Sequence, residues 1–249
     1  MRLDLRDEMT LVEHLEELRA VVLRILLILF ISFFVAYGLG EYIAEFLLRP
    51  LRAALGVDGG QIVYLGILDK VIAQLQVAFW SAIILSSPLW FWQLWRFIRP
   101  GLYDHEARAI RPFILVGFLL FCFGVSFGYF LVFPITFELL MAFGVGDVDA
   151  MISLRDYLIL ASKVLVVLGL MFQLPNAILI MGFMGLVTGD SLRQWRRYVY
   201  VGFGALAATM TPPDVVTMSA LWIPLVALYE LGIWAVVFIV HPFLKRRSS

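Results

Sequence analysis

The sequence predicts an all-α, polytopic membrane protein with six transmembrane helices that form a concave bundle, with both termini in the cytoplasm. Hydrophobic residues make up 62% of the chain and the mean hydropathy is +0.94, well above the values of soluble domains. Most of the 19 Lys and Arg residues lie near the chain ends and in alternate gaps between apolar stretches, which the positive-inside rule places in the cytoplasm. A length of 249 residues allows one bundle, so we expect a single membrane domain over residues 1–249.

An amphipathic helix over about residues 10–20 should open the chain on the cytoplasmic side. Thr10 and Glu13 fit a capping box, so the helix is expected to begin at Thr10. The leucines of this segment fall on one helical face and its glutamates on the other. The segment should therefore lie at the membrane interface and continue into the first span, over about residues 20–39.

Five further apolar stretches complete the predicted bundle, and prolines mark several of them. They cover about residues 71–97, 112–134, 157–183, 198–211 and 216–240. We expect Pro88 to bend the second stretch and Pro175 to interrupt the fourth. The third stretch is bracketed by Pro112 and Pro134, which lie at its two ends. The extracytoplasmic loops are expected over about residues 40–70, 134–156 and 212–215.

The fifth span is short. Its 14 residues rise about 21 Å, against about 30 Å of hydrocarbon. The bilayer must become thinner around it, or the flanking Trp195, Arg196 and Arg197 must snorkel to the interface.

The most distinctive string lies between the second and third spans, from Phe97 to Glu106. Pro100–Gly101 forces a turn and Asp104 can cap the helix that follows, which leaves Glu106 in its first turn beside Arg108. From this string alone, Glu106 either offsets the helix dipole and makes exposed ion pairs or belongs to a binding site.

This string resembles the loop between the second and third spans of the TatC family, the signal-recognition subunit of the twin-arginine translocase. His14–Arg19 resembles the family's N-terminal motif, Tyr129–Pro134 its third span, and Thr211–Asp214 its turn between the last two spans. The four matches occur in the family's order along almost the whole chain.

The resemblance implies a receptor and translocase core that binds the twin-arginine signal peptides of folded proteins. In the family, one acidic residue of the N-terminal motif and one of the loop bind the paired arginines, and these positions are Glu17 and Glu106 here. The chemistry suits that role, because two guanidiniums need carboxylate acceptors in a matching fork geometry. The residues that would shape the site by the same resemblance are Phe97, Pro100, Leu102, Tyr103 and Arg108.

The resemblance also implies partners in the cytoplasmic membrane of a prokaryote. The chain would recruit single-span proteins of the TatA and TatB type, form a homo-oligomer in the receptor complex, and draw on the proton-motive force. Thr211 matches the family's polar docking site for partners, whereas Ala208 and Met218 depart from it. No enzymatic activity, cofactor, metal or nucleic-acid partner is expected.

Gln173 stands where relatives carry a membrane-embedded glutamate, and an amide cannot titrate. The amide of Gln173 still has a donor and an acceptor, so it can bind water or help to thin the membrane. We therefore expect Gln173 to line a wet, concave face of the bundle. Alternatively, Gln173 satisfies a carbonyl that Pro175 leaves free. The broken helix at Gln173 and Pro175 also raises the rival function of a secondary transporter, although the chain shows no inverted repeat. A purely structural scaffold is the third alternative.

Three other features receive weaker interpretations. Gly124 and Gly128 form a GxxxG motif, which either packs helices closely or arises by chance. Lys163 is expected to snorkel from near one end of its span and receives no function. Tyr103–Asp104 and Gly144–Asp147 spell the motifs of intramembrane aspartyl proteases, but a complete span separates them by about 30 Å, too far to share a proton.

Overall fold

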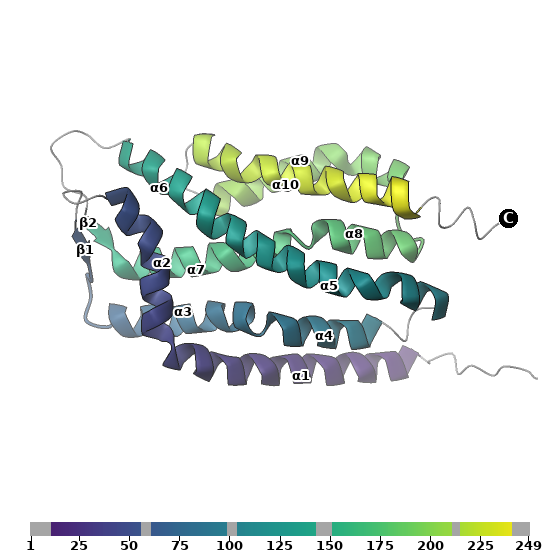
Figure 1. Ribbon diagram of the computed structural model, residues 1–249, viewed down its shortest axis with the longest axis horizontal. Coiled ribbons are helices and arrows are strands. Elements are labelled where there is room, and N and C mark those ends of the chain that lie inside the picture. The colour runs from purple at the N-terminus through teal and green to yellow at the C-terminus, as the bar shows by residue number, and fades with distance from the viewer. Residues whose placement is uncertain (1–10, 56–60, 99–103, 143–150, 211–214, 241–249) are drawn as a thin grey trace, which may run out of the picture.

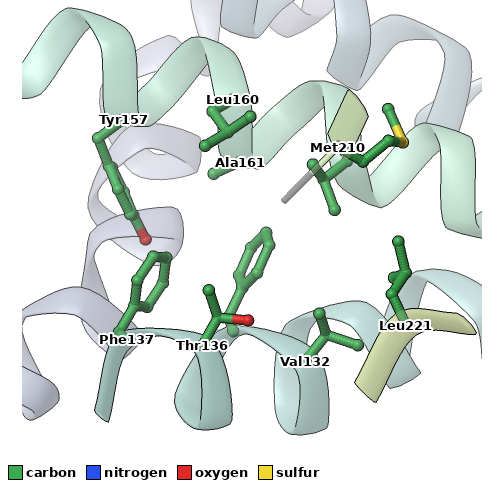
Figure 2. Close-up of a pocket in the computed structure, with 10 residues that line it drawn as sticks. Val132, Thr136, Phe137, Tyr157, Leu160, Ala161, Met210 and Leu221 are labelled. Atoms are coloured by element: carbon green, nitrogen blue, oxygen red, sulfur yellow. The ribbon is translucent and has the colours of Figure 1, made fainter. Parts of the chain in front are cut away.

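The protein is a bundle of long helices that run side by side, closed at one end by a transverse helix (Figure 1). This computed structural model describes residues 11–55, 61–98, 104–142, 151–210 and 215–240. Its elements are α1 (Leu11–Gly38), α2 (Gly40–Leu55), β1 (Gln61–Val63), α3 (Asp69–Leu85), α4 (Ser87–Ile98), α5 (Asp104–Phe127), the π-helical turn η2 (Gly128–Val132), α6 (Phe133–Ala142), β2 (Met151–Ser153), α7 (Leu154–Met171), α8 (Leu174–Phe183), α9 (Gly189–Met210), α10 (Val215–Ala235) and the π-helical turn η3 (Val236–Val240).

The helical membrane fold is confirmed, and five of the six predicted spans are long and apolar enough to cross a membrane. Within the described residues, four helical stretches are long and apolar enough to cross a membrane, and the bent pair α3–α4 makes a fifth. The remaining predicted span, the fifth along the chain, is α9. This helix carries Asp190 and three arginines in its first turns, so its apolar part begins only at Tyr198. The start of α1 and the end of α10 lie at the same end of the bundle, as an even number of crossings requires (Figure 1).

The first helix agrees with the prediction. α1 runs without a break over Leu11–Gly38, so the amphipathic segment and the first span are one helix. It begins one residue after Thr10, which itself lies outside the described residues.

The second span bends by 54° between α3 and α4, which confirms the prediction at Pro88. Pro88 has no N–H to donate to the carbonyl four residues before it, so the α-helical pattern cannot continue through this point. Ser86 is the C-cap of α3, and its N–H and its hydroxyl both donate to the carbonyl of Ala82, at 3.0 and 2.6 Å.

The third span begins beside Pro112, as predicted, but it does not end at Pro134. The apolar span covers Ile114–Glu138, within a helix that begins at Asp104 and continues past Pro134 to the end of α6. The π-helical turn η2 comes directly before α6, and the N–H of Phe133 donates to the carbonyl of Gly128, five residues back. This wider turn adjusts the hydrogen-bonding register, so the helix tolerates a proline that has no N–H.

Two short strands join the extracytoplasmic segments, and this pairing was not predicted. β1 pairs in parallel with β2, with Ile62 opposite Ile152. Beside the strands, Asp69 accepts hydrogen bonds from the N–H groups of Leu65 and Gly66. It also forms an ion pair with Arg155, at 3.2 Å. One carboxylate therefore fastens the start of α3 to the start of α7.

Two tyrosines of the bundle donate hydrogen bonds to the transverse helix α2. Tyr129 donates to the carbonyl of Phe46 at 2.8 Å, and Tyr157 donates to the carbonyl of Leu47 at 2.5 Å. Because these tyrosines lie on η2 and α7, the end cap is tied to the centre of the bundle.

A close helix packing joins α5 and η2 to α7, and it uses the predicted GxxxG motif. A Cβ on Gly124 would lie 2.9 Å from the backbone oxygen of Leu168, and one on Gly128 would lie 2.7 Å from the Leu168 side chain. Only glycine allows this approach, so the motif packs helices and is not a chance occurrence.

Candidate functional site

The start of α1, the end of α4 and the start of α5 lie at one end of the bundle, opposite the α2 cap (Figure 1). This is the cytoplasmic end by the charge pattern of the sequence. The predicted recognition residues lie on these three helices and on the segment that joins α4 to α5.

Glu17 lies on the face of α1 that packs into the bundle. Val21 and Ile25 follow it at intervals of four residues; Val21 is 3% exposed, and Ile25 packs against the cluster of Trp90, Phe91 and Phe121. Glu17 is half-buried, and its Oε2 atom is buried without a hydrogen-bond partner among the described residues. A buried carboxylate oxygen without a donor is costly, so this atom is an open acceptor.

The neighbouring residues of α1 face outward. The Glu16 side chain is exposed, and Leu15 and Leu18 are 63% and 39% exposed. The predicted apolar stripe therefore faces the surroundings of the bundle, and the adjacent Glu16 and Glu17 differ sharply in environment.

The loop residues of the predicted site are only partly placed. Because α5 begins at Asp104, Glu106 lies in its first turn, as predicted, and Arg108 follows directly after that turn. Phe97 is half-buried near the end of α4. The remaining predicted residues, Pro100, Leu102 and Tyr103, lie outside the described residues.

Gln173 lies between α7 and α8, at the break that Pro175 predicts. Its Nε2 atom donates to the carbonyl oxygen of Gly117 on α5 at 2.7 Å. The alternative that this amide satisfies a carbonyl freed by Pro175 is therefore wrong, since its partner belongs to another helix. The half-buried Gln173 instead links the α7–α8 break to the middle of α5.

Asn176 extends this polar cluster and was missed in the sequence. It is 7% exposed, and a Cβ on Gly117 would lie 2.6 Å from its Nδ2 atom. Its Oδ1 atom is buried without a hydrogen-bond partner within the described part of the chain. The available signal was its spacing, since Asn176 lies one helical turn after Gln173.

A second cluster joins α9 to α10. Glu230 accepts from Arg196 and from the hydroxyl of Tyr200, each at 2.5 Å. Arg196 was expected to snorkel, but it pairs instead with a carboxylate inside the last span. Trp222 donates to the carbonyl of Tyr200 at 2.8 Å, which adds a second link between the same helices.

The predicted docking residue Thr211 lies outside the described residues. Of the two positions that depart from the family pattern, Ala208 is exposed on α9 and Met218 is half-buried on α10. Trp195 is 61% exposed near the cytoplasmic end of α9, where an interfacial anchor belongs.

Comparison with known proteins gives a consistent result over most of the chain. The family model described as "Sec-independent protein translocase protein (TatC)" matches residues 13–224. The protein of that name from Desulforapulum autotrophicum is 38% identical over 89% of this chain and 82% of its own length. The one from Campylobacter jejuni is 33% identical over 95% of this chain and 96% of its own length.

The fold comparison agrees. A crystal structure of the twin-arginine translocase receptor TatC superposes with a TM-score of 0.80 at 29% identity, covering 90% of this chain and 98% of that one. The same receptor crystallised in DDM gives a TM-score of 0.81 at 29% identity. The chain therefore belongs to the TatC family of Sec-independent protein translocase components, which are polytopic membrane proteins and not enzymes.

Proposed function

We propose that this protein is the receptor and core of a twin-arginine translocase in the cytoplasmic membrane of a prokaryote. It binds the twin-arginine signal peptides of folded proteins, with Glu17 and Glu106 as acceptors for the two arginines. The observation that carries the proposal is the open Oε2 atom of Glu17, on the face of α1 that packs into the bundle at its cytoplasmic end.

The chemistry of the two carboxylates favours arginine over lysine. A guanidinium presents several N–H donors in a rigid fork, and it sheds water more readily than an ammonium does. A half-buried carboxylate with an unused oxygen can accept such a fork, whereas at an exposed carboxylate water competes with the guanidinium. Glu17 has the first environment and Glu16 the second. Two carboxylates on separate helices, α1 and α5, suit two successive arginines.

The segment between α4 and α5 shapes the rest of the site in this proposal. Phe97 and Arg108 flank it on the two helices, and the family resemblance adds Pro100, Leu102 and Tyr103. An apolar wall beside the carboxylates excludes water and strengthens each charge-assisted hydrogen bond.

Partner recruitment belongs to the same proposal. The apolar part of α9 extends from Tyr198 to Met210, about 20 Å at the helical rise, so it is shorter than the hydrocarbon core. This edge, with Thr211 at its end, would dock TatA- and TatB-type single-span proteins whose own spans are short. Export would use the proton-motive force and a receptor complex with several copies of this chain.

The rival function of a secondary transporter has less support. Its motivation was the broken helix at Gln173 and Pro175, and the break exists. Its polar side chain, however, already donates to Gly117 on α5, so it closes a contact between helices.

The test compares Glu17→Gln with Glu16→Gln in the full-length protein. The amide keeps the shape of Glu17 but removes its charge, so binding of a twin-arginine peptide should weaken about 10- to 100-fold, as the loss of a charge-assisted hydrogen bond predicts. Glu16→Gln is the matched control, and its binding should not change. Fluorescence anisotropy of a labelled signal peptide in nanodiscs measures both, and thermal unfolding confirms that each variant is folded.

A paired-lysine peptide completes the design. The wild type should discriminate against it, and Glu17→Gln combined with Glu106→Gln should lose that discrimination. Unchanged affinity for the twin-arginine peptide in the double variant would refute the proposal. Coupled uptake of a small solute without any peptide binding would favour the transporter instead.

A further inference from the structure

Trp195, Arg197 and Tyr198 form one exposed cluster on α9. Trp195 and Tyr198 are 61% and 57% exposed, and their ring centroids lie 5.7 Å apart. The Arg197 guanidinium lies over the Tyr198 ring, 4.7 Å from its centroid, and its Nη2 atom donates to the Tyr198 hydroxyl at 2.8 Å. Because this hydroxyl oxygen accepts from Arg197, its own proton remains available for a ligand.

Arg197 differs from the two other arginines at the start of α9 in its counter-charge. Arg193 pairs with Asp190, and Arg196 pairs with Glu230. Among the described residues, no carboxylate pairs with Arg197. The cluster therefore carries one unbalanced positive charge beside a hydroxyl proton and an indole N–H.

Two contacts fix the level of this cluster against α10 and η3, which lie beside α9 (Figure 1). A Cβ on Gly189 would meet Val237. Seven residues further along α9, Arg196 pairs with Glu230, seven residues earlier in the neighbouring helix. The two helices are therefore antiparallel with a regular register. Arg197 is one residue beyond Arg196, so it lies level with position 229.

This level is deep in the membrane. The apolar span of α10 and η3 covers Thr217–Val240, so its midpoint falls near residue 228. The Arg197 side chain leans toward the start of its helix by about one turn, which leaves its guanidinium about 6 Å from that midpoint on the cytoplasmic side. The hydrocarbon of an undisturbed bilayer extends about 15 Å from its centre. A charge at this depth is costly and needs a polar counterpart.

The exposed surface differs between the two helices at these levels. On α10 and η3, the large side chains that stay exposed toward the cytoplasmic end are apolar, namely Leu231, Trp234, Phe238 and Ile239. On α9, the exposed side chains at the same levels are Arg193, Gln194, Trp195 and Arg197. The edge of the hydrocarbon therefore steps inward beside α9, and a polar group of the bilayer must descend to the cluster.

An open apolar surface continues from the cluster toward the extracytoplasmic side. Val201 lies one turn beyond Arg197 and is 74% exposed, and Gly202 and Ala205 are exposed after it. A Cβ on Gly202 would meet nothing within 4 Å, so the surface is flat and uncovered by the described part of the chain. An acyl chain can lie along it while its headgroup stays at the cluster.

We propose that the cluster of Trp195, Arg197 and Tyr198 binds the phosphate of an anionic phospholipid from the cytoplasmic leaflet. The guanidinium supplies the charge and a fork of N–H donors, and the hydroxyl and the indole N–H also donate to the phosphate oxygens. A phosphoglycerol headgroup suits the site better than phosphocholine, because a choline cation would lie beside the guanidinium. A free phosphate would make the same polar contacts but would leave the surface at Gly202 uncovered.

Native mass spectrometry of the full-length protein in detergent tests the site. The protein is titrated with phosphatidylglycerol and phosphatidylcholine of identical chains, and with glycerol 3-phosphate as the headgroup alone. The wild type should bind phosphatidylglycerol about fivefold more tightly than phosphatidylcholine, the size of one basic residue at a membrane surface. Glycerol 3-phosphate at the same concentration should not displace the lipid.

Variants assign the preference to the cluster. Arg197→Gln should abolish it, and Arg197→Lys should keep part of it, because lysine retains the charge without the fork. Tyr198→Phe leaves the charge unchanged and should weaken phosphatidylglycerol binding about threefold, the size of one hydrogen bond within a membrane. Arg24→Gln is the matched control, since Arg24 is an exposed arginine in the cytoplasmic half of α1 that makes no ion pair or ring contact with the described residues.

Three results would overturn the proposal. The wild type could bind the two lipids equally. Arg197→Gln and Arg24→Gln could lose the preference to the same extent, which a diffuse attraction between charges predicts. Glycerol 3-phosphate could displace the lipid, which would show an anion site that needs no acyl chain. Thermal unfolding of each variant confirms that a lost preference does not arise from a lost fold.

Discussion

Replacing Gly124 with alanine should push α5 away from α7. The new Cβ would meet the backbone oxygen of Leu168 at 2.9 Å, where ordinary contact begins at 3.4 Å, and a backbone atom cannot rotate aside. The two helices must then separate by about half an ångström, which already forfeits about a quarter of the dispersion attraction at each contact of the interface. Gly128 and Gly169 lie in the same interface and loosen together with Gly124.

The expected magnitude follows from two opposing effects. Overpacking costs about 1–3 kcal/mol, whereas alanine gains about 1 kcal/mol over glycine in a helix interior. Gly202 on α9 is the matched control, because a Cβ there meets nothing within 4 Å and only the gain applies. The free energy of unfolding of Gly124→Ala should therefore lie about 1–3 kcal/mol below that of Gly202→Ala.

The assay is reversible unfolding in mixed micelles of dodecyl maltoside and SDS, followed by tryptophan fluorescence. Both variants are measured against the wild type in one titration series. Equal stability of Gly124→Ala and Gly202→Ala would refute the reasoning, because the close approach of α5 to α7 would then carry no energy.

Two further predictions concern the polar clusters. Gln173→Leu removes the donor to Gly117 and should lower the free energy of unfolding by about 1 kcal/mol or less, the usual size of one hydrogen bond between membrane helices. Export of a twin-arginine reporter should fall while peptide binding persists. Unimpaired export would show that Gln173 has no part in the mechanism. Glu230→Gln leaves Arg196 without its counter-charge, and because both side chains are partly exposed the loss should be about 1–2 kcal/mol by SDS titration. Arg193→Gln, which breaks only an exposed pair, should change stability by less than about 0.5 kcal/mol, and an equal effect of the two variants would contradict the ranking.

The fold class and most of the spans could be predicted because hydropathy and charge act residue by residue. Proline positions predicted the bend at Pro88 and the break at Pro175 for the same local reason. They failed at Pro134, because a helix can pass a proline through a wider turn. Nothing local distinguishes a proline that ends a helix from one that the helix absorbs.

Contacts between segments that are distant along the chain could not be predicted from the sequence. The pairing of Ile62 with Ile152 joins two strands of three residues each, too short for a periodic signal. The ion pair of Arg196 with Glu230 depends on how α9 is rotated against α10, which hydropathy does not fix.

The candidate site was predictable in its chemistry and only partly in its geometry. The sequence placed several glutamates on one face of the first helix, but the packing of α1 turns Glu17 inward and leaves Glu16 exposed. That distinction arises from the contact of Ile25 with the aromatic cluster around Phe121, which no pattern within α1 encodes.

The packing of α1 is sparse but fixed at two places. Only 11% of its apolar window is buried, and Ala36 lies against Ala78 and Ala82 at the extracytoplasmic end. Near the other end, Val21 and Ile25 pack inward, and Val21 lies one turn, about 6 Å, from Glu17. A peptide that binds Glu17 therefore pulls on a carboxylate that its own helix holds in place, and the load passes directly into the aromatic cluster around Phe121.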